Sequence, residues 1–415
     1  MARSSPLRSE TFHWTFSGSR DAIWTALADT ERFNEAAGLP RYDIEERTDA
    51  DGRVRFFAEA KVRGVKLAWE ELPTNWVRNA WFSHTRVFSQ GPLATMTAEL
   101  QLQDRVGGSE GFYTLSASPR TIFGRLLLNT GFFSSARRDF TELASQADAF
   151  ATGISATAFD VAPVVLEPDA EAQLAKLAGL NSDAGDGAAV RNRLIAHIRS
   201  ASEIDVRRMR PLQLAGKWGT DEQATIAASF EGVRDGLLAA TWDLLCPRCQ
   251  GAKASSDTLD ALPTEAHCAS CNITYGRDFA KNVELTFYPS RSIRRTPDGE
   301  FCLYGPMTTP HVHAQLTVAP RSSRDVDLTS LPASRLRLRL LEAPVETEAR
   351  FAARAADGPT PSTIRIAPDE ITTEQAPTRA AGALNTTIVN DSDRLLTLVI
   401  DEPHWSRDAL TADRV

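Results

Sequence analysis

The sequence contains no run of about eighteen apolar residues, so it predicts no membrane-spanning helix. No apolar run follows the basic residues of the opening segment MARSSPLRSETFHWTF either, which excludes a secretory signal. Without export, we expect the protein to reside in the reducing cytoplasm. A P-loop, a GxGxxG motif on a strand–helix unit and a nucleophile motif are also absent, so the sequence predicts no catalytic machinery of these kinds.

Positive charge is not in excess. The 415 residues carry a formal net charge of −8. Generic binding to nucleic acids or anionic membranes needs clustered lysine and arginine, which release counterions, so an acidic chain is a poor generic binder of either. A local basic patch remains compatible with this balance. The 42% of hydrophobic residues is typical of a globular protein, and the length predicts two to four domains.

Cysteine is scarce but ordered. Four of the five cysteines form two C-x-x-C pairs separated by residues 250–267: Cys246, Cys249, Cys268 and Cys271. In a reducing compartment this pattern favours a metal over disulfides. Each pair can place two thiolates about 2.3 Å from one ion, and four thiolates complete a tetrahedron without an open position. We therefore predict one structural zinc ion per chain, which stabilises a small ribbon by on the order of 10 kcal/mol.

Other interpretations of the cysteines stay open. The four thiols can be buried without metal, or one pair can be a redox motif, although a redox motif would not need two pairs. His267 can replace its neighbour Cys268 as a ligand. The fifth cysteine, Cys302, is expected to be a core residue.

Residues 1–153 alternate strand-like and helical patterns. Phe12, Trp14 and Phe16 occupy alternate positions of a strand, and a helical stretch follows over 19–34. Asp51-Gly52 indicates a hairpin. Further strand-like segments cover 41–48, 53–61, 65–73, 76–83, 94–104 and 110–118. A long helical region then runs to about residue 150, with a basic face that carries Arg125, Arg137 and Arg138.

This order resembles the START-like helix-grip superfamily (SRPBCC) over about residues 8–150, in pieces such as SRDAIWTALADTERFNEAAGLP. The resemblance implies a curved sheet that wraps a long helix and leaves an apolar cavity for a small hydrophobic ligand. Some START-like proteins are enzymes. Four polar groups are candidates for such acid–base chemistry in this cavity, and a solvated strand face is the alternative: Glu70, Glu71, His84 and Tyr113.

Residues 154–188 are rich in Ala, Asp, Pro and Gly and predict a linker with a short helix near 171–180. Over 189–241 we expect a winged-helix-like segment, with an apolar stripe of Val190, Leu194 and Ile198 and a capping box from Thr220 to Gln223. DNA binding is disfavoured, because the recognition helix would begin with Asp221 and Glu222 and offer only Arg234 as a cation. A helical packing module is the favoured interpretation, and we expect no nucleic-acid partner.

The zinc ribbon is expected over 242–280. Period-two patterns such as Val283–Phe287 and Leu336–Leu340 then predict a β-sandwich over 281–405, before a connector over 406–415. The fold class is thus α+β and multidomain: a START-like helix-grip domain, a winged-helix-like helical segment, a zinc ribbon and a C-terminal β-sandwich. His311 and His313 share one strand face, which allows a second metal site near Cys302, but exposed or interface histidines are the favoured interpretation.

Several motifs occur in order from about Asp205 onward and resemble a single family. They are the runs 240–249 and 265–273, the strand 283–287 and the segment 309–315. Together they resemble an uncharacterised domain found immediately upstream of class III adenylate/guanylate cyclase domains in bacteria, often after a START-like domain. The metal-binding, base-recognition and transition-state residues of the cyclase have no counterpart here, and residues 407–415 look like the connector that leads into that domain.

The resemblance implies a non-catalytic sensory or regulatory module of a nucleotide-cyclase-type signalling protein. In this hypothesis a small hydrophobic ligand binds the START-like domain, and a zinc-stapled module relays the change to a cyclase domain or another protein partner. A stand-alone protein-interaction scaffold without a small ligand is the alternative. A cyclase- or hydrolase-like enzyme that uses the START-like cavity is a weaker one.

Overall fold

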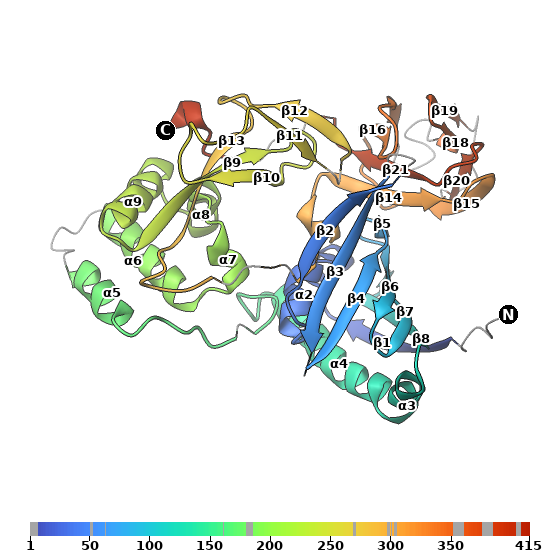
Figure 1. The fold of residues 1–415 in the computed structure, drawn as a ribbon, viewed down its shortest axis with the longest axis horizontal. Coiled ribbons are helices and arrows are strands. Elements are labelled where there is room, and N and C mark those ends of the chain that lie inside the picture. The colour runs from blue at the N-terminus through green and yellow to red at the C-terminus, as the bar shows by residue number, and fades with distance from the viewer. Residues whose placement is uncertain are drawn as a thin grey trace. The chain divides into compact units, whose positions relative to one another are not determined.

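The computed structural model divides the chain into two compact units (Figure 1). Unit 1 comprises residues 1–160 and 299–405, and unit 2 comprises residues 161–298 and 406–415. No helix among the described residues is long and apolar enough to cross a membrane. The structure describes residues 7–49, 53–62, 64–160, 162–179, 186–268, 271–296, 299, 301–302, 305–351, 361–375, 385–403 and 408–415.

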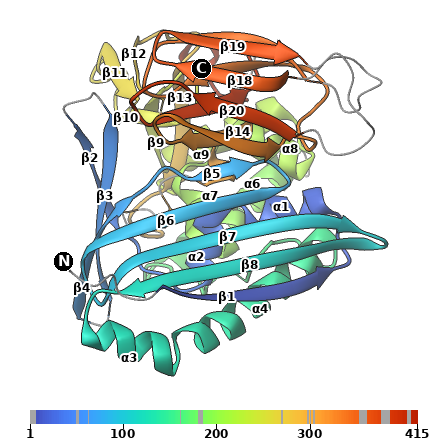
Figure 2. The same ribbon diagram turned by 90° about the vertical axis from the view of Figure 1, so that its right-hand side faces the viewer.

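The N-terminal part of unit 1 has the element order of a helix-grip fold, with antiparallel strands followed by a long helix. Figure 2 shows α3 and α4 following the last strand of this group, β8. Along the chain the elements are β1 (Arg8–Phe16), α1 (Arg20–Leu27), α2 (Thr30–Ala36), β2 (Asp43–Thr48), β3 (Val54–Val62), β4 (Val65–Glu71), β5 (Asn75–Val77), β6 (Trp81–Gln90), β7 (Leu93–Arg105), β8 (Gly108–Pro119), α3 (Ile122–Thr130) and α4 (Phe132–Ala151). The hairpin signal Asp51-Gly52 lies outside the described residues.

Three predicted segments are interrupted. The helix expected over 19–34 is two helices, because Asp29 caps the second one and its Oδ1 accepts a hydrogen bond from the Arg32 amide at 3.2 Å. The strand expected over 76–83 breaks at a tight turn in which Asn79 has a φ of 62°. The long helical region that was expected to run to about residue 150 divides at Gly131 into α3 and α4.

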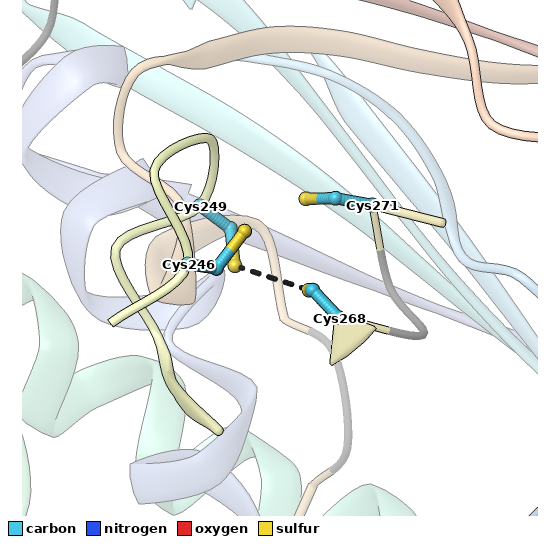
Figure 3. A group of neighbouring side chains, drawn as sticks. All are labelled: Cys246, Cys249, Cys268 and Cys271. Atoms are coloured by element: carbon cyan, nitrogen blue, oxygen red, sulfur yellow. Dashed lines mark hydrogen bonds between the residues drawn. The ribbon is translucent and has the colours of Figure 1, made fainter. Parts of the chain in front are cut away.

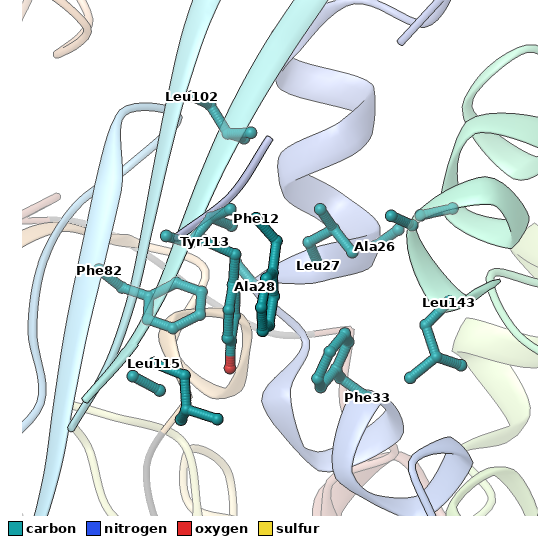
Figure 4. Close-up of a cluster of buried hydrophobic side chains, with 14 of the residues drawn as sticks. Phe12, Ala26, Leu27, Ala28, Phe33, Phe82, Leu102, Tyr113, Leu115 and Leu143 are labelled. Carbon is teal, nitrogen blue, oxygen red and sulfur yellow. The ribbon is translucent and has the colours of Figure 1, made fainter. Parts of the chain in front are cut away.

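The core of this part lies between the sheet and the helices. Alternate residues of β1 and β8 point inward, as the period of a strand requires. Aromatic rings from strands and helices meet there: Tyr113 lies 6.1 Å from Phe33 of α2 and 5.3 Å from Phe140 of α4 between ring centroids. Figure 4 shows Phe12, Phe33 and Tyr113 in this cluster. The contacts join the sheet to both helices and fix how they pack.

The C-terminal part of unit 1 continues the same sheet. Ala314 pairs with Val77, and Gln315 with Trp76, so β14 follows β5 in the strand order. The strands that extend the sheet are β14 (Val312–Val318), β21 (Leu396–Asp401), β16 (Arg335–Leu340) and β17 (Glu346–Arg350). A four-stranded sheet shares a buried apolar cluster with them and consists, in spatial order, of β15 (Ser322–Asp327), β20 (Asn385–Asn390), β18 (Pro361–Ala367) and β19 (Glu370–Gln375).

Unit 2 packs helices against a three-stranded sheet in the order β10–β9–β13, with a separate β11–β12 hairpin. Its helices are α5 (Ala170–Gly179), α6 (Asp186–Ser200), α7 (Glu203–Arg207), α8 (Pro211–Trp218) and α9 (Glu222–Arg234). Its strands are β9 (Leu238–Leu245), β10 (Ala252–Ser256), β11 (Glu265–Cys268), β12 (Ile273–Gly276) and β13 (Val283–Pro289). Near the C-terminus, the Leu285 amide donates to the Leu410 carbonyl at 2.8 Å, so residues around 410 also pack on this sheet.

Two assignments in unit 2 were wrong. We expected the strand at 283–287 to belong to the β-sandwich, but β13 pairs along its whole length with β9. Six of its seven residues are buried, so both of its faces are covered and its apparent period of two does not mark one solvated face. The capping box predicted from Thr220 to Gln223 was also wrong. The N-cap residue of α9 is Asp221, whose Oδ1 accepts a hydrogen bond from the Ala224 amide at 2.8 Å.

Candidate metal centre and interior polar cluster

The first cysteine pair lies in a tight loop between β9 and β10. The Cys246 amide donates to the Gly251 carbonyl at 2.9 Å, and the Gln250 amide donates to the Cys246 carbonyl at 2.8 Å. Gln250 takes a positive φ of 55°, which lets the chain turn directly after Cys249. This backbone geometry directs both thiols of the pair to the same side of the loop.

The second pair joins β11 and β12. Cys268 is the last residue of β11, and the Cys271 amide donates to the Cys268 carbonyl at 3.2 Å. The four sulfur atoms all lie within 4.8 Å of one another, and the Sγ atoms of Cys249 and Cys268 are 3.8 Å apart. Figure 3 shows the four side chains converging from the two loops. The structure thus brings all four predicted ligands together.

The donor set fits a zinc ion. A tetrahedron with 2.3 Å metal–sulfur bonds has sulfur–sulfur distances of about 3.8 Å, close to the separation of Cys249 and Cys268. All four cysteines are buried, against apolar neighbours that include Leu262 and Tyr275. Hydrogen bonds among the thiols raise the pKa of Cys246 and Cys271 and lower the pKa of Cys249 and Cys268. A zinc ion would replace these hydrogen bonds with four metal–thiolate bonds and leave no coordination position for water or substrate.

His267 does not take part in this cluster. Its neighbour Cys268 is buried whereas His267 is exposed, because successive residues of β11 point to opposite faces. The His267 Nδ1 lies 3.1 Å from the Thr274 Oγ1 on the paired strand. The interpretation of His267 as a replacement ligand is therefore wrong. Cys302 lies in unit 1, where it is buried and accepts a hydrogen bond from the Thr30 hydroxyl at 3.0 Å.

A second group of polar side chains lies inside unit 1. The carboxylate of Glu71 on β4 faces Arg86 on β6, with 3.2 Å between Glu71 Oε2 and Arg86 Nε. His84 Nε2 contacts the other oxygen of Glu71, and the Trp69 indole donates to Glu71 Oε2 at 2.6 Å. The Arg86 guanidinium also donates to the Tyr42 hydroxyl at 3.4 Å. We call these five residues the interior polar cluster.

Burial and charge pairing set the protonation of this cluster. Glu71 is 5% exposed and Arg86 is 8% exposed. Burial acts to raise the pKa of Glu71, but the charges of Arg86 and His84 and the hydrogen bonds from Trp69 and Arg86 together outweigh it and lower that pKa overall. Burial lowers the pKa of His84 despite the nearby carboxylate, so the imidazole is neutral near pH 7. Burial also acts to lower the pKa of Arg86, but Glu71, with smaller contributions from Tyr42 and Cys302, outweighs that effect, and the pKa is raised overall.

The structure separates the polar residues that the sequence had grouped together. Glu71 and His84 meet inside the domain, so a solvated face was the wrong interpretation for this pair. Glu70 points the other way and forms an ion pair with Arg55. Tyr113 lies in the aromatic core, where burial raises its pKa. Arg86 was missed, although it continues the period-two series of Phe82, His84 and Phe88 that marks the inward face of β6.

His311 and His313 are not exposed, contrary to the interpretation that we favoured. They are 1% and 4% exposed, and His313 Nε2 lies 3.1 Å from a carboxylate oxygen of Glu402. A register shift between Val312 and Ala314 disturbs the simple alternation on which that interpretation relied. Among the described residues, the four cysteines are the only group of three or more His, Cys, Asp or Glu side chains placed to share a metal ion.

Comparison with known proteins adds one family match. Residues 170–300 match a family of unknown function, DUF5939. This segment covers most of unit 2 and includes all four cysteines of the metal centre. No curated protein matches the sequence.

Several solved structures resemble about a third of the chain. The Zhui aromatase/cyclase from Streptomyces sp. R1128 shares 14% identity, with a TM-score of 0.28, over 36% of this chain and 98% of that one. The di-domain aromatase/cyclase StfQ from the steffimycin pathway shares 11% identity, with a TM-score of 0.26, over 36% of this chain and 53% of its own. Protein Ms6760 from Mycobacterium smegmatis shares 19% identity, with a TM-score of 0.23, over 37% of this chain and 99% of its own. These values are too low to assign a ligand or an activity to this chain.

Proposed function

We propose that the chain is a non-catalytic regulatory module that binds a small, mainly apolar ligand inside unit 1. One observation carries this proposal: a buried and charge-paired polar cluster lies beside an aromatic core on the same sheet. Phe88 packs against both the aromatic core and the apolar group around Tyr42 and Trp69. A ligand with an apolar body and one polar group would find partners of both kinds there.

The metal centre has a structural role in this proposal. Its four thiolates would saturate zinc, so the ion holds the two loops of unit 2 together and does no chemistry. The proposal that the module regulates a nucleotide cyclase domain is based on its sequence motifs, which resemble those of domains that precede such cyclases. A ligand can regulate in this way only if it binds two states of the module with different affinity.

Titration with N-phenyl-1-naphthylamine, an apolar dye that fluoresces when it leaves water, tests ligand binding. We expect saturable binding to the full chain, and competition by a long-chain alcohol. Replacement of Glu71 with Gln should change the ranking of competing alcohols, carboxylates and hydrocarbons, because it alters the charge beside Arg86. Absence of saturable binding by the wild-type chain would rule out the ligand site.

The regulatory part needs a separate test. A class III cyclase domain from the same organism is assayed for cyclic nucleotide formation with and without this chain. We expect the added chain to change the rate, and we expect no cyclic nucleotide from the chain alone. An unchanged rate at saturating concentrations of the chain would contradict the cyclase connection while leaving ligand binding intact.

A protein-interaction scaffold is the second candidate, and the aromatic core favours it. Phe33 lies 5.2 Å from Phe140 and 5.9 Å from Phe159 between ring centroids, so side chains occupy space between the sheet and the long helix. A scaffold needs no small ligand. The same dye titration separates the candidates, since a scaffold with a filled core should give no saturable signal.

A further inference from the structure

Helix α3 carries apolar side chains that face outward. Ile122 is 87% exposed, Phe123 is 63% exposed and Leu126 is 56% exposed. These three residues fall within one and a half turns of the helix, so they form a single apolar patch, which we call the α3 patch. In Figure 2, α3 lies beyond the edge of the sheet that β1 and β8 form. These apolar residues do not serve the protein core, because the residues of α3 that face the core are Gly124 and Leu128.

The opposite face fixes α3 in this orientation. Leu128 is buried in the core of unit 1. Gly124 lies so close to the turn between β6 and β7 that an added Cβ would be 2.0 Å from the Pro92 carbonyl oxygen. At the end of the helix, the Arg8 guanidinium donates to the Leu128 carbonyl at 2.9 Å. The α3 patch is therefore displayed by a docked helix, and its exposure does not arise from a loose one.

Positive charge is in excess along the part of the chain that carries the patch. Residues 111–138 contain four arginines and no aspartate or glutamate. Arg125 lies on α3 itself and has no ion-pair partner among the residues that the structure describes, and the exposed Arg120 precedes Thr121, the N-cap residue of the helix. Arg137 and Arg138, on α4, are partly neutralised by Glu10 and Asp139 at 3.0 Å. This local excess of positive charge contrasts with the net charge of −8 of the whole chain.

We propose that the α3 patch docks the protein onto an anionic lipid bilayer. A helix with large apolar side chains flanked by arginines is the arrangement that binds at the boundary between headgroups and acyl chains. Ile122, Phe123 and Leu126 would enter the acyl region, while Arg125 would contact lipid phosphates. The Arg120 guanidinium already donates to the Ser89 and Gly91 carbonyls and would add positive charge at the bilayer surface. A stable protein interface buries about 800 Å² on each partner, far more than three side chains of one short helix supply. Partial insertion into a bilayer needs no such area.

Co-sedimentation of the full chain with lipid vesicles tests this proposal. Vesicles of phosphatidylcholine alone are compared with vesicles that also contain phosphatidylglycerol. We expect binding to the anionic vesicles and little binding to the neutral ones. Added salt should weaken the binding, because each arginine near the surface contributes about fivefold to the affinity through attraction that salt screens. Absence of binding to anionic vesicles would overturn the proposal.

Substitutions locate the surface. The double variant Phe123→Ser, Leu126→Ser should bind anionic vesicles at least about tenfold more weakly, since it removes two large apolar groups from the bilayer contact. Val106→Ser is the matched control: Val106 is 99% exposed in the turn between β7 and β8, at the far end of β8 from α3. It should bind like the wild type. Equal binding by the double variant would exclude the α3 patch as the docking surface.

A second copy of the chain is the other occupant that the experiment can reveal. Sedimentation velocity without vesicles measures the oligomeric state of the wild type and of the double variant. We expect both to sediment alike. A wild-type dimer that the double variant abolishes, together with no vesicle binding, would show that the α3 patch is a contact between copies and would overturn the lipid proposal.

Discussion

Glu284 on β13 lies directly opposite Asp243 on β9, and both carboxylates are fully buried. Two like charges opposite each other on neighbouring strands destabilise a sheet unless they are neutralised. Each has its own arginine: Arg210 Nε lies 2.9 Å from Glu284 Oε1, and Arg208 Nε lies 2.9 Å from Asp243 Oδ2. Both arginines belong to the segment around α7 and α8, so these ion pairs tie the helices of unit 2 to the sheet that leads into Cys246.

Removal of one buried carboxylate should therefore destabilise unit 2. Glu284→Gln leaves the guanidinium of Arg210 in a largely buried position without its countercharge. We expect a loss of about 3–5 kcal/mol in the free energy of unfolding. Urea unfolding followed by circular dichroism measures it. Glu222→Gln is the control, because it removes a carboxylate from an exposed ion pair with Arg414, and its effect should be close to zero.

Replacement of two helical glycines with alanine should change the free energy of unfolding in opposite directions. Gly124→Ala places a methyl group against the Pro92 carbonyl oxygen, which is backbone and cannot turn aside. We expect a loss of about 1–3 kcal/mol in unfolding free energy. At Gly216 in α8 an added Cβ meets nothing within 4 Å, so Gly216→Ala should stabilise by up to about 1 kcal/mol. Thermal unfolding of both variants checks the pair, and destabilisation by Gly216→Ala would contradict the packing described for α8.

Acidification should destabilise unit 1 through His84. Burial lowers the pKa of His84 below its ordinary value of 6.5, so the unfolded chain binds more protons than the folded one once the pH falls below 6.5. The free energy of unfolding should therefore decrease as the pH falls from about 7 to about 5. The lowered pKa of Glu71 keeps its carboxylate ionised in this range.

Replacement of the imidazole identifies its contribution. His84→Gln should show a smaller decrease over the same pH range, measured by urea unfolding followed by tryptophan fluorescence. His13→Gln is the control, because the side chain of His13 is 53% exposed, and it should retain the decrease of the wild type. Identical pH dependence in His84→Gln and the wild type would show that His84 does not titrate as described.

The sequence predicted best what depends on short-range spacing. The proximity of the four cysteines followed from two C-x-x-C pairs, because the local backbone of such a loop directs both thiols to one point. The strand and helix order of the N-terminal part followed from periods of two and of 3.6. Both features depend on residues that are near one another in the chain.

The features that sequence could not predict depend on partners far apart in the chain. Pairing between β5 and β14 joins Val77 to Ala314, and nothing near either residue specifies the other. The partner of β13 was missed for the same reason. Arg86 was missed because an arginine in a strand is usually solvated, and only the folded sheet shows that Glu71 neutralises it inside the domain.

Metal analysis of the purified chain is the most direct test of the central claim, that four cysteines hold a structural zinc ion. Cells grown with adequate zinc should yield a wild-type chain with one zinc per chain, and Cys268→Ser should bind substantially less and unfold at lower urea concentration. Cys302→Ser, which alters the one cysteine outside the cluster, should retain the zinc. A wild-type chain without zinc, or equal loss of zinc in Cys302→Ser and Cys268→Ser, would contradict the account.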